Sequence, residues 1–373
     1  MSTSEFDDAG PTDPFRTLDP EQRLALHGEA TGDDLVAAVL ADPDNDELRL
    51  VYGDYLIEHE DPRGELIQLQ RQTEKATHYD RTVWDRQAEL LQAHWTEWCA
   101  PLHPALEPTS IEFRRGFLWR CKTLDNTMVL RDVIGHPMWR TVGDLQTFER
   151  ALLTNPCVRG VKRFRTGTDG VVALGNVTHE LAVEHLDLLS FHAQYAPSYY
   201  DHFPQVLEHA LWPRLADLGP LRHVRAITAR THVDPRNLES RTFLQSPLGN
   251  QLEVLEYYAA ECTLEPWEFL MREHSSLRRL HVHTGRAIDR RSSTDRGGAI
   301  LERDADGNIH PILAIDTDPH AHEAIVALAT MPADYRSVEI LVFGALFDEV
   351  TQPLVERLRQ RFDDVIVRAF VRP

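Results

Sequence analysis

The 373-residue sequence has few cysteines, and none of them is arranged for metal or redox chemistry. Cys99, Cys121, Cys157 and Cys262 are widely separated, and no two of them form a Cys-x-x-Cys pair. This spacing argues against a zinc knuckle, a thioredoxin-like centre and the disulfide framework of a small secreted domain. We therefore expect four reduced thiols, most of them buried.

Long apolar runs are also missing. No stretch approaches the roughly 18 apolar residues that a membrane span needs. The first basic residue is Arg16, so the charged start and the apolar stretch of a secretory signal are both lacking. These absences predict a cytoplasmic protein without a membrane partner.

Basic residues are scarce relative to acidic ones. The chain has 39 Lys and Arg against 59 Asp and Glu, a formal charge of −20, and this excludes a basic nucleic-acid binder. Residues 1–65 hold 18 acidic and 4 basic side chains and thus most of the net charge. The densest basic patch is Arg114-Arg115-Gly116-Phe117 with Arg120 and Lys122. We expect this patch to pair with the acidic helical region before it, and we expect no nucleic-acid partner.

Motifs for catalysis are absent as well. No Gly-rich phosphate loop follows a predicted strand, Gly-x-Ser-x-Gly does not occur, and no cysteine lies beside a histidine-bearing motif. Asp54, Glu58, Asp61 and Glu65 are explained by helix capping and solvation. The sequence therefore predicts no catalytic residue, no cofactor and no enzymatic activity.

Hydrophobic residues make up 42% of the chain, which is enough to build a sizeable core. Residues 1–30 combine prolines with acidic residues and have too few apolar groups to offset the entropy of ordering. We predict three regions: a flexible acidic segment at 1–30, a helical module at 31–106 and an α/β region at 107–373.

Four helices are predicted in the module from apolar spacing and capping residues. They run from Asp33 or Asp34 to near Asp42, from Asn45 or Asp46 to before Asp61, from Pro62 to about Lys75, and from about Asp80 to Ala100. Prolines at positions 43 and 62 delimit the first three. Within the module, we expect Arg63 to bridge Asp54 or Glu58.

The segment at 41–72, ADPDNDELRLVYGDYLIEHEDPRGELIQLQRQ, resembles the bacterial repeat-companion domain. The matching residues are Arg49, Leu50, Tyr52, Asp54, Leu56, Asp61, Pro62, Arg63, Gly64 and Glu65. Gly53 and Tyr55 depart from the usual pattern, where Ala and Trp are common, but both changes are compatible with the fold. EFRRGFLWRCKTL at 112–124 resembles the strand that follows this module. The resemblance implies a helical cap on a leucine-rich-repeat-like array and brings no catalytic residues.

After Ile111 a hexad recurs in which the first, fourth and sixth residues are apolar. Clear copies begin at Val183, Leu252, Leu277 and Val338, and poorer ones lie at 158–164, 221–227 and 364–370. Several copies follow a helical stretch, which predicts an irregular leucine-rich-repeat-like solenoid with a curved, mainly parallel sheet. A doubly wound α/β sheet is the alternative. Residues 285–318 are predicted to insert a β-hairpin, with strands at 299–303 and 309–315 and its tip outside the solenoid.

Side chains at the third, fifth and seventh positions of each hexad are expected on the concave face of the sheet. This face mixes charges, imidazoles and one aromatic ring, as protein recognition surfaces do. The sequence thus predicts a non-catalytic scaffold that binds a protein partner through ten residues, namely Lys162, His185, Asp187, His223, Arg225, Glu256, Tyr258, Arg279, His281 and His283.

Two other functions stay open. His281 and His283, with His320 and His322, have spacings that suit a metal-dependent hydrolase. Against this, the first His-x-His pair falls at three quarters of the chain, whereas barrel hydrolases have it early. Chance pairs are also expected among 19 histidines, and we predict no metal site.

The other function that stays open is mimicry of a polyanion, in which the acidic front end would occupy a basic partner. The sequence predicts neither the partner's identity nor the oligomeric state.

Overall fold

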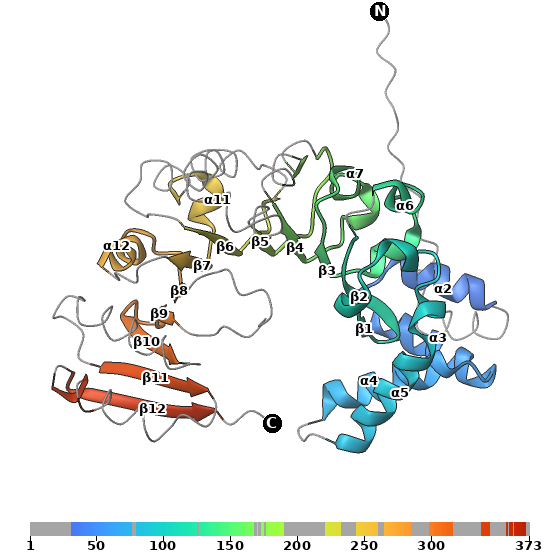
Figure 1. Cartoon of the computed structure of the whole chain (residues 1–373), viewed down its shortest axis with the longest axis horizontal. Helices are drawn as coiled ribbons and strands as arrows, with labels where there is room; N and C mark the ends of the chain where they lie inside the picture. The colour runs from blue at the N-terminus through green and yellow to red at the C-terminus, as the bar shows by residue number, and fades with distance from the viewer. Residues whose placement is uncertain are drawn as a thin grey trace, which may run out of the picture. The chain divides into compact units, whose positions relative to one another are not determined.

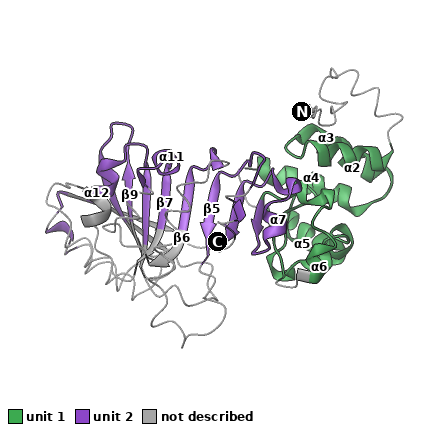
Figure 2. Cartoon of the chain, turned by 90° about the horizontal axis from the view of Figure 1, so that it is seen from above, with its two compact units in different colours: residues 1–143 green, residues 144–373 purple. Residues whose placement is uncertain are grey.

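The computed structural model shows a mixed α/β protein with two compact units, Met1–Gly143 and Asp144–Pro373 (Figure 2). The first unit extends past the predicted module boundary at residue 106, because a β-hairpin packs with the helices. The structure describes residues 31–76, 80–124, 127–167, 170, 173–174, 177–189, 221–232, 244–259, 265–284, 298–315, 337–343, 356, 358–360 and 362–370. The acidic segment 1–30 and Cys262 lie outside these ranges.

Four helices in the first unit lie where the sequence predicts them. They are α2 (Gly32–Ala41), α3 (Asp46–Glu58), α4 (Pro62–Lys75) and α5 (Arg81–Trp98). Asn45, Asp61 and Asp80 cap the last three through side-chain oxygens that accept backbone N–H bonds. The cap of α2 is Thr31, and Asp34 completes a capping box from the third helical position.

The helices pack around a small apolar core. Its buried members are Leu35, Val39, Tyr52, Leu56, Ile67 and Phe117. Helices α3 and α4 approach closely at Gly64, where an added Cβ would lie 2.7 Å from the Gly53 carbonyl oxygen and 2.8 Å from the Ile57 nitrogen. Only a residue without a side chain fits between these two backbones.

A β-hairpin completes this core. Strands β1 (Glu112–Arg114) and β2 (Phe117–Lys122) are joined by Arg115 and Gly116, with φ of 52° and 75°. Two successive positive φ values define the two-residue turn that suits the twist of a hairpin. The unit continues through η1 (His103–Ala105) and η2 (Pro108–Ser110) before the hairpin, and α6 (Thr127–Arg131) and η3 (Pro137–Thr141) after it.

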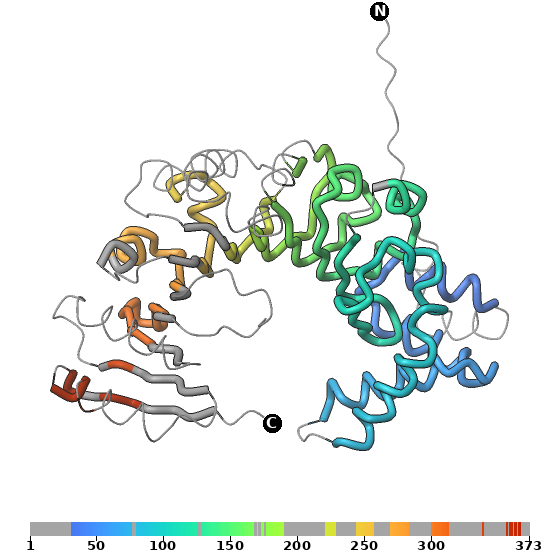
Figure 3. Tube along the Cα trace, in the orientation of Figure 1, coloured from blue at the N-terminus to red at the C-terminus, as the bar shows by residue number. Residues whose placement is uncertain are grey.

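The second unit is an open sheet of ten described strands whose order in the sheet follows the chain (Figures 1 and 3). Strands β3 to β8 are parallel, β9 is antiparallel to both neighbours, and β10 to β12 are parallel. The strands are β3 (Asp144–Gln146), β4 (Arg163–Thr166), β5 (His185–Leu188), β6 (Ala226–His232), β7 (Val254–Ala259), β8 (Arg279–Thr284), β9 (Gly298–Arg303), β10 (Ile309–Ile315), β11 (Ser337–Phe343) and β12 (Asp364–Phe370).

Helical segments connect several of the strands. These are α7 (Arg150–Leu153), η4 (Pro156–Val158), α11 (Pro247–Asn250) and α12 (Glu265–Glu273). The described part of the sheet has no point at which the strand order reverses, whereas a doubly wound sheet requires one. A mostly parallel α/β sheet is therefore confirmed, and the leucine-rich-repeat character stays a prediction.

One face of the sheet carries a continuous apolar row. Residues at the fourth hexad position pair across β3 to β8 and are fully buried, namely Leu145, Phe164, Leu186, Ile227, Leu255 and Leu280. Leu301 on the antiparallel β9 pairs with Leu280 and continues the row. Two of the poorer hexad copies were placed three residues too early in the prediction. The strand register assigns them to Val161–Thr166 and Val224–Ala229.

The predicted hairpin at 299–315 is confirmed, with Ile309 opposite Arg303. Its turn at 304–308 is exposed, but its strands are built into the sheet, since β9 pairs with β8 and β10 pairs with β11. Pairing of β10 with β11 begins at Ile312, immediately after Pro311, which has no N–H to donate.

Among the described residues, no helix combines the length and apolarity needed to cross a bilayer.

Candidate functional site

The face of the sheet opposite the apolar row carries a set of polar side chains. They occupy the third and fifth hexad positions on β3 to β8, which alternate with the buried fourth position. We call this set the polar face, and it comprises Asp144, Arg163, Arg165, His185, Asp187, Thr228, Glu256, Arg279 and His281.

Five of the ten residues predicted from the sequence lie on the polar face, namely His185, Asp187, Glu256, Arg279 and His281. Tyr258 and His283 stand opposite each other on β7 and β8, and their side chains are outside the described part of the structure. Lys162, His223 and Arg225 precede β4 and β6. The structure therefore does not place these three in the strands where the hexad frame expected them.

Four members of the polar face were missed by the sequence prediction: Asp144, Arg163, Arg165 and Thr228. Arg163 and Arg165 flank Phe164, which is the fourth residue of its hexad once the frame is corrected. The available signal was the paired Arg-Phe-Arg pattern. It was misread because Val158 and Val161, three residues apart, both fit the first position of the hexad.

Arginines and aspartates form an ion-pair network across β3, β4 and β5. Arg165 donates to the carboxylate of Asp144 over 2.7 Å, and Arg163 donates to Asp187 over 3.3 Å. A third pair joins Arg165 Nε and Asp187 Oδ2 over 3.9 Å. Asp187 is fully buried, whereas 33% of the Arg163 side chain is exposed. The buried carboxylates thus fix guanidinium groups that still reach solvent, because a buried charge is tolerated only with such partners.

A second chain of hydrogen bonds crosses β5, β6 and β7. The Thr228 hydroxyl donates to Glu256 over 2.9 Å, and His185 Nε2 lies 2.7 Å from the same hydroxyl oxygen. Since a threonine hydroxyl has one proton, His185 must donate to it, which assigns the Nε2–H tautomer. The imidazole therefore cannot withdraw the threonine proton, and Thr228 is only 3% exposed. This arrangement stabilises the sheet and does not resemble an activated nucleophile.

Burial lowers the pKa of His185 below its ordinary value, and the charge of Arg163 acts in the same direction. Asp187 and Glu256 oppose the shift without reversing it. The imidazole is consequently neutral in the folded protein near pH 7, and it donates to Thr228 through its Nε2–H.

This shift predicts a pH-dependent stability. As pH falls below about 6.5, the unfolded chain binds a proton on His185 more readily than the folded protein does, so the free energy of unfolding decreases. We expect His185→Gln, which retains a donor for Thr228, to reduce the difference in urea-unfolding free energy between pH 5.5 and pH 7.5. A residual difference is expected, since burial also lowers the pKa values of His136, His179 and His274. Equal pH dependence in the two proteins would contradict the role of His185.

Exposed ion pairs lie on the polar face and at the residues next to its strands. Lys162 lies 3.7 Å from Glu184, Arg225 lies 3.8 Å from Glu253, and Arg279 lies 3.6 Å from Glu302. His223 contacts Glu180. Such exposed pairs contribute little to stability, roughly 0–1 kcal/mol each. Their charges can therefore exchange one partner for another at small cost.

No three His, Cys, Asp or Glu side chains in the described ranges are grouped so that they could hold a metal ion. His320 and His322 lie outside those ranges, as does the side chain of His283. His281 is on the polar face and 7% exposed. The metal-site alternative thus stays an untested prediction.

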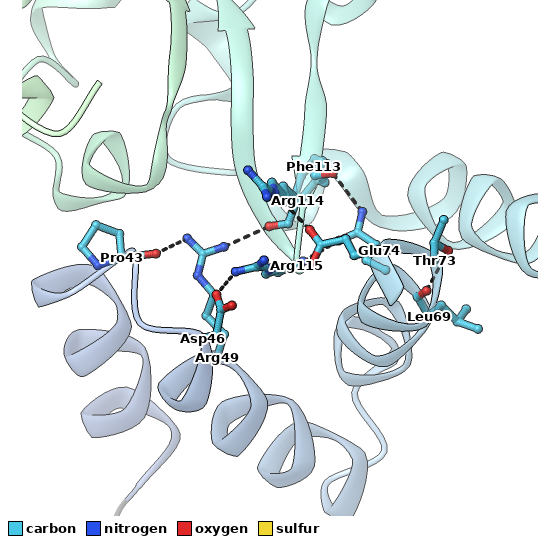
Figure 4. Close-up of polar contacts among 11 residues, drawn as sticks. Pro43, Asp46, Arg49, Leu69, Thr73, Glu74, Phe113, Arg114 and Arg115 are labelled. Atoms are coloured by element: carbon cyan, nitrogen blue, oxygen red, sulfur yellow. Dashed lines mark hydrogen bonds and ion pairs between the residues drawn. The ribbon is translucent and has the colours of Figure 1, made fainter. Parts of the chain in front are cut away.

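The basic hairpin turn of the first unit is part of its internal packing (Figure 4). Arg114 Nε and Arg115 Nε lie 3.0 and 2.8 Å from the carboxylate of Glu74, and Arg115 also pairs with Asp46. The predicted pairing of this patch with the helical module is thus confirmed for Arg114 and Arg115, whereas Arg120 pairs with Glu112 and Lys122 pairs with Glu107, both outside the module. Arg49 bonds the carbonyl oxygens of Pro43 and Arg114 and closes the same junction.

The prediction that Arg63 bridges Asp54 or Glu58 was wrong. Its Nε donates to the Gly116 carbonyl oxygen over 2.7 Å, and its guanidinium lies 4.5 Å from the centre of the Phe117 ring. Burial lowers the pKa of Arg63, although Tyr52 and Asp61 oppose the shift. This arginine therefore links α4 to the hairpin.

The three described cysteines are free and buried, as predicted for most of the four thiols. Burial raises the pKa of the Cys99 thiol to about 12, so this residue remains protonated at neutral pH. A protonated, enclosed thiol is a poor nucleophile.

Comparisons with family models, with curated proteins and with solved structures give no match to this chain. The resemblance to the repeat-companion domain therefore remains a prediction from the motifs at 41–72 and 112–124.

Proposed function

We propose that the protein is a non-catalytic interaction scaffold that binds a protein partner through the polar face. The observation that carries this proposal is the network in which buried Asp144 and Asp187 hold Arg163 and Arg165. Groups that are already fixed lose little side-chain entropy on binding, and arginine is enriched among the residues that dominate binding energy. The leucine-rich-repeat-like architecture and action in the cytoplasm are parts of the same proposal.

The chemistry of the polar face favours recognition over catalysis. Thr228, the described hydroxyl of the polar face with a histidine neighbour, donates its proton to Glu256 and is enclosed by the sheet. Charges of both signs alternate across the strands, which suits a partner of complementary charge pattern. Lys162, His223 and Arg225 precede the strands and are candidates for the rim of the interface.

Charge reversal at Arg279 tests the proposal. Arg279 is 43% exposed, and its pair with Glu302 is an exposed one, so Arg279→Glu should leave the fold intact. Once a partner has been purified with the protein from its native cells, we expect Arg279→Glu to weaken the measured affinity by about 10-fold to 100-fold, because it opposes a partner carboxylate. Biolayer interferometry at two salt concentrations provides the measurement.

Arg81→Glu is the matched control, since Arg81 is an exposed arginine on α5 with its own carboxylate neighbour, Asp85. It should leave the affinity unchanged. If Arg279→Glu and Arg225→Glu also bind with unchanged affinity, the polar face is not the interface.

A further inference from the structure

Strand β12 is the last strand of the sheet among the strands that the structure describes. It pairs with β11 along all seven residues, from Asp364 to Phe370. Among the described strands, none pairs with its other side. An edge of this length presents unpaired backbone N–H and C=O groups, which favour the addition of a further strand.

The sequence of β12 is suited to pairing. Val365, Ile366 and Val367 are consecutive β-branched residues, which fit a pleated surface well. The Ile366 side chain is 42% exposed. Ile366 stands opposite Glu339 on β11 and belongs to the face opposite Val338, which is buried. The strand therefore exposes a large apolar side chain beside an edge that no other described strand occupies.

The strand is also complementary to itself in one register. When two copies lie antiparallel about a two-fold axis at Ile366, Asp364 of each copy stands opposite Arg368 of the other. Val365 then faces Val367, and Ile366 faces its own counterpart. Residues directly opposite in an antiparallel pair have neighbouring side chains on the same face of the sheet, so this register forms two opposite-charge pairs around an apolar centre.

Neighbouring registers lose this match. With the axis at Val367, Asp364 stands opposite Phe370 and Arg368 stands opposite Ile366. With the axis at Val365, Asp364 stands opposite Ile366. Charge complementarity thus selects the register centred on Ile366.

We propose that two copies of this chain associate through β12, in antiparallel register about Ile366, to form one continuous sheet. An interface of this kind uses the same strand of both copies, as two-fold symmetry requires. A second copy supplies the edge with both backbone partners and the matching charges. The pairing does not use the polar face, so its test is independent of partner binding.

A charge-swap series tests the proposal by sedimentation equilibrium over a concentration series. The full chain is expected to show a monomer–dimer equilibrium. Asp364→Arg and Arg368→Asp should each raise the dimer dissociation constant by about ten-fold, because each places like charges opposite one another twice. The double variant, Asp364→Arg with Arg368→Asp, should restore dimerisation. The matched control is the same exchange at the exposed pair Arg81 and Asp85 on α5, which should have no effect.

A second measurement covers the case in which a charge variant fails to fold. In Ile366→Cys the two new thiols face each other across the axis, so mild oxidation should give a covalent dimer on a non-reducing gel. Ile57→Cys, at an exposed isoleucine of the first unit, should give no covalent dimer under the same conditions. A monomeric wild type at all concentrations, an unrestored double variant or the absence of a cross-link in Ile366→Cys would each overturn the proposal.

Discussion

Replacing Gly64 with alanine is expected to lower the free energy of unfolding of the first unit by about 3 kcal/mol, a cost typical of severe overpacking. The added methyl group would lie 2.7 Å from the Gly53 carbonyl oxygen and 2.8 Å from the Ile57 nitrogen. Both are backbone atoms of α3, so relief requires α3 and α4 to move apart. Differential scanning calorimetry should show the transition of this unit lowered by about 10 °C.

Gly135→Ala provides the control, since no atom lies within 4 Å of a Cβ added there. We expect its transition temperature to match that of the wild type. If Gly64→Ala unfolds at the wild-type temperature as well, the close approach of α3 and α4 is not a constraint on the fold.

Removing the carboxylate of Asp187 is expected to have an effect of similar size in the second unit. Asp187→Ala removes the buried acceptor of Arg163, which lies 3.3 Å from it, and the more distant of the two carboxylates near Arg165, which keeps Asp144 at 2.7 Å. Loss of a hydrogen bond to a charged partner costs about 1.5–3 kcal/mol. Urea unfolding followed by circular dichroism should show a correspondingly lower midpoint.

Glu302→Ala is the comparison for this change, because Glu302 pairs with Arg279 at the exposed surface. It should cost less than about 1 kcal/mol. Similar midpoints for the two variants would mean that burial does not determine the strength of these ion pairs.

Helix boundaries in the first unit could be predicted because their determinants are local. Asn45, Asp61 and Asp80 each accept a bond from a backbone N–H two residues later, so a short stretch of sequence contains the whole signal. Thr31 was missed as the cap of α2 because Asp33 and Asp34 also fit the pattern. Only the geometry shows that Asp34 supports the cap from inside the helix.

The roles of Arg63 and of the polar face could not be predicted in the same way. Arg63 donates to a carbonyl oxygen 53 residues away in the sequence. Asp54 and Glu58, which are closer in the sequence, could also have accepted a hydrogen bond from a guanidinium. Before and within β4, apolar residues recur three positions apart at Val158, Val161 and Phe164, so the first position of the hexad can be assigned in two ways. The strand pairing of Phe164 with Leu186 decides between them, and this pairing depends on segments that sequence alone does not align.

The strand order of the second unit has a mechanical consequence. Each described strand from β4 to β11 is hydrogen-bonded only to the strands before and after it along the chain, so no strand has to be threaded between two others that have already formed. We expect such a sheet to assemble progressively as the polypeptide leaves the ribosome. A force applied to the C-terminus should peel β12 away first and then shorten the sheet one strand at a time.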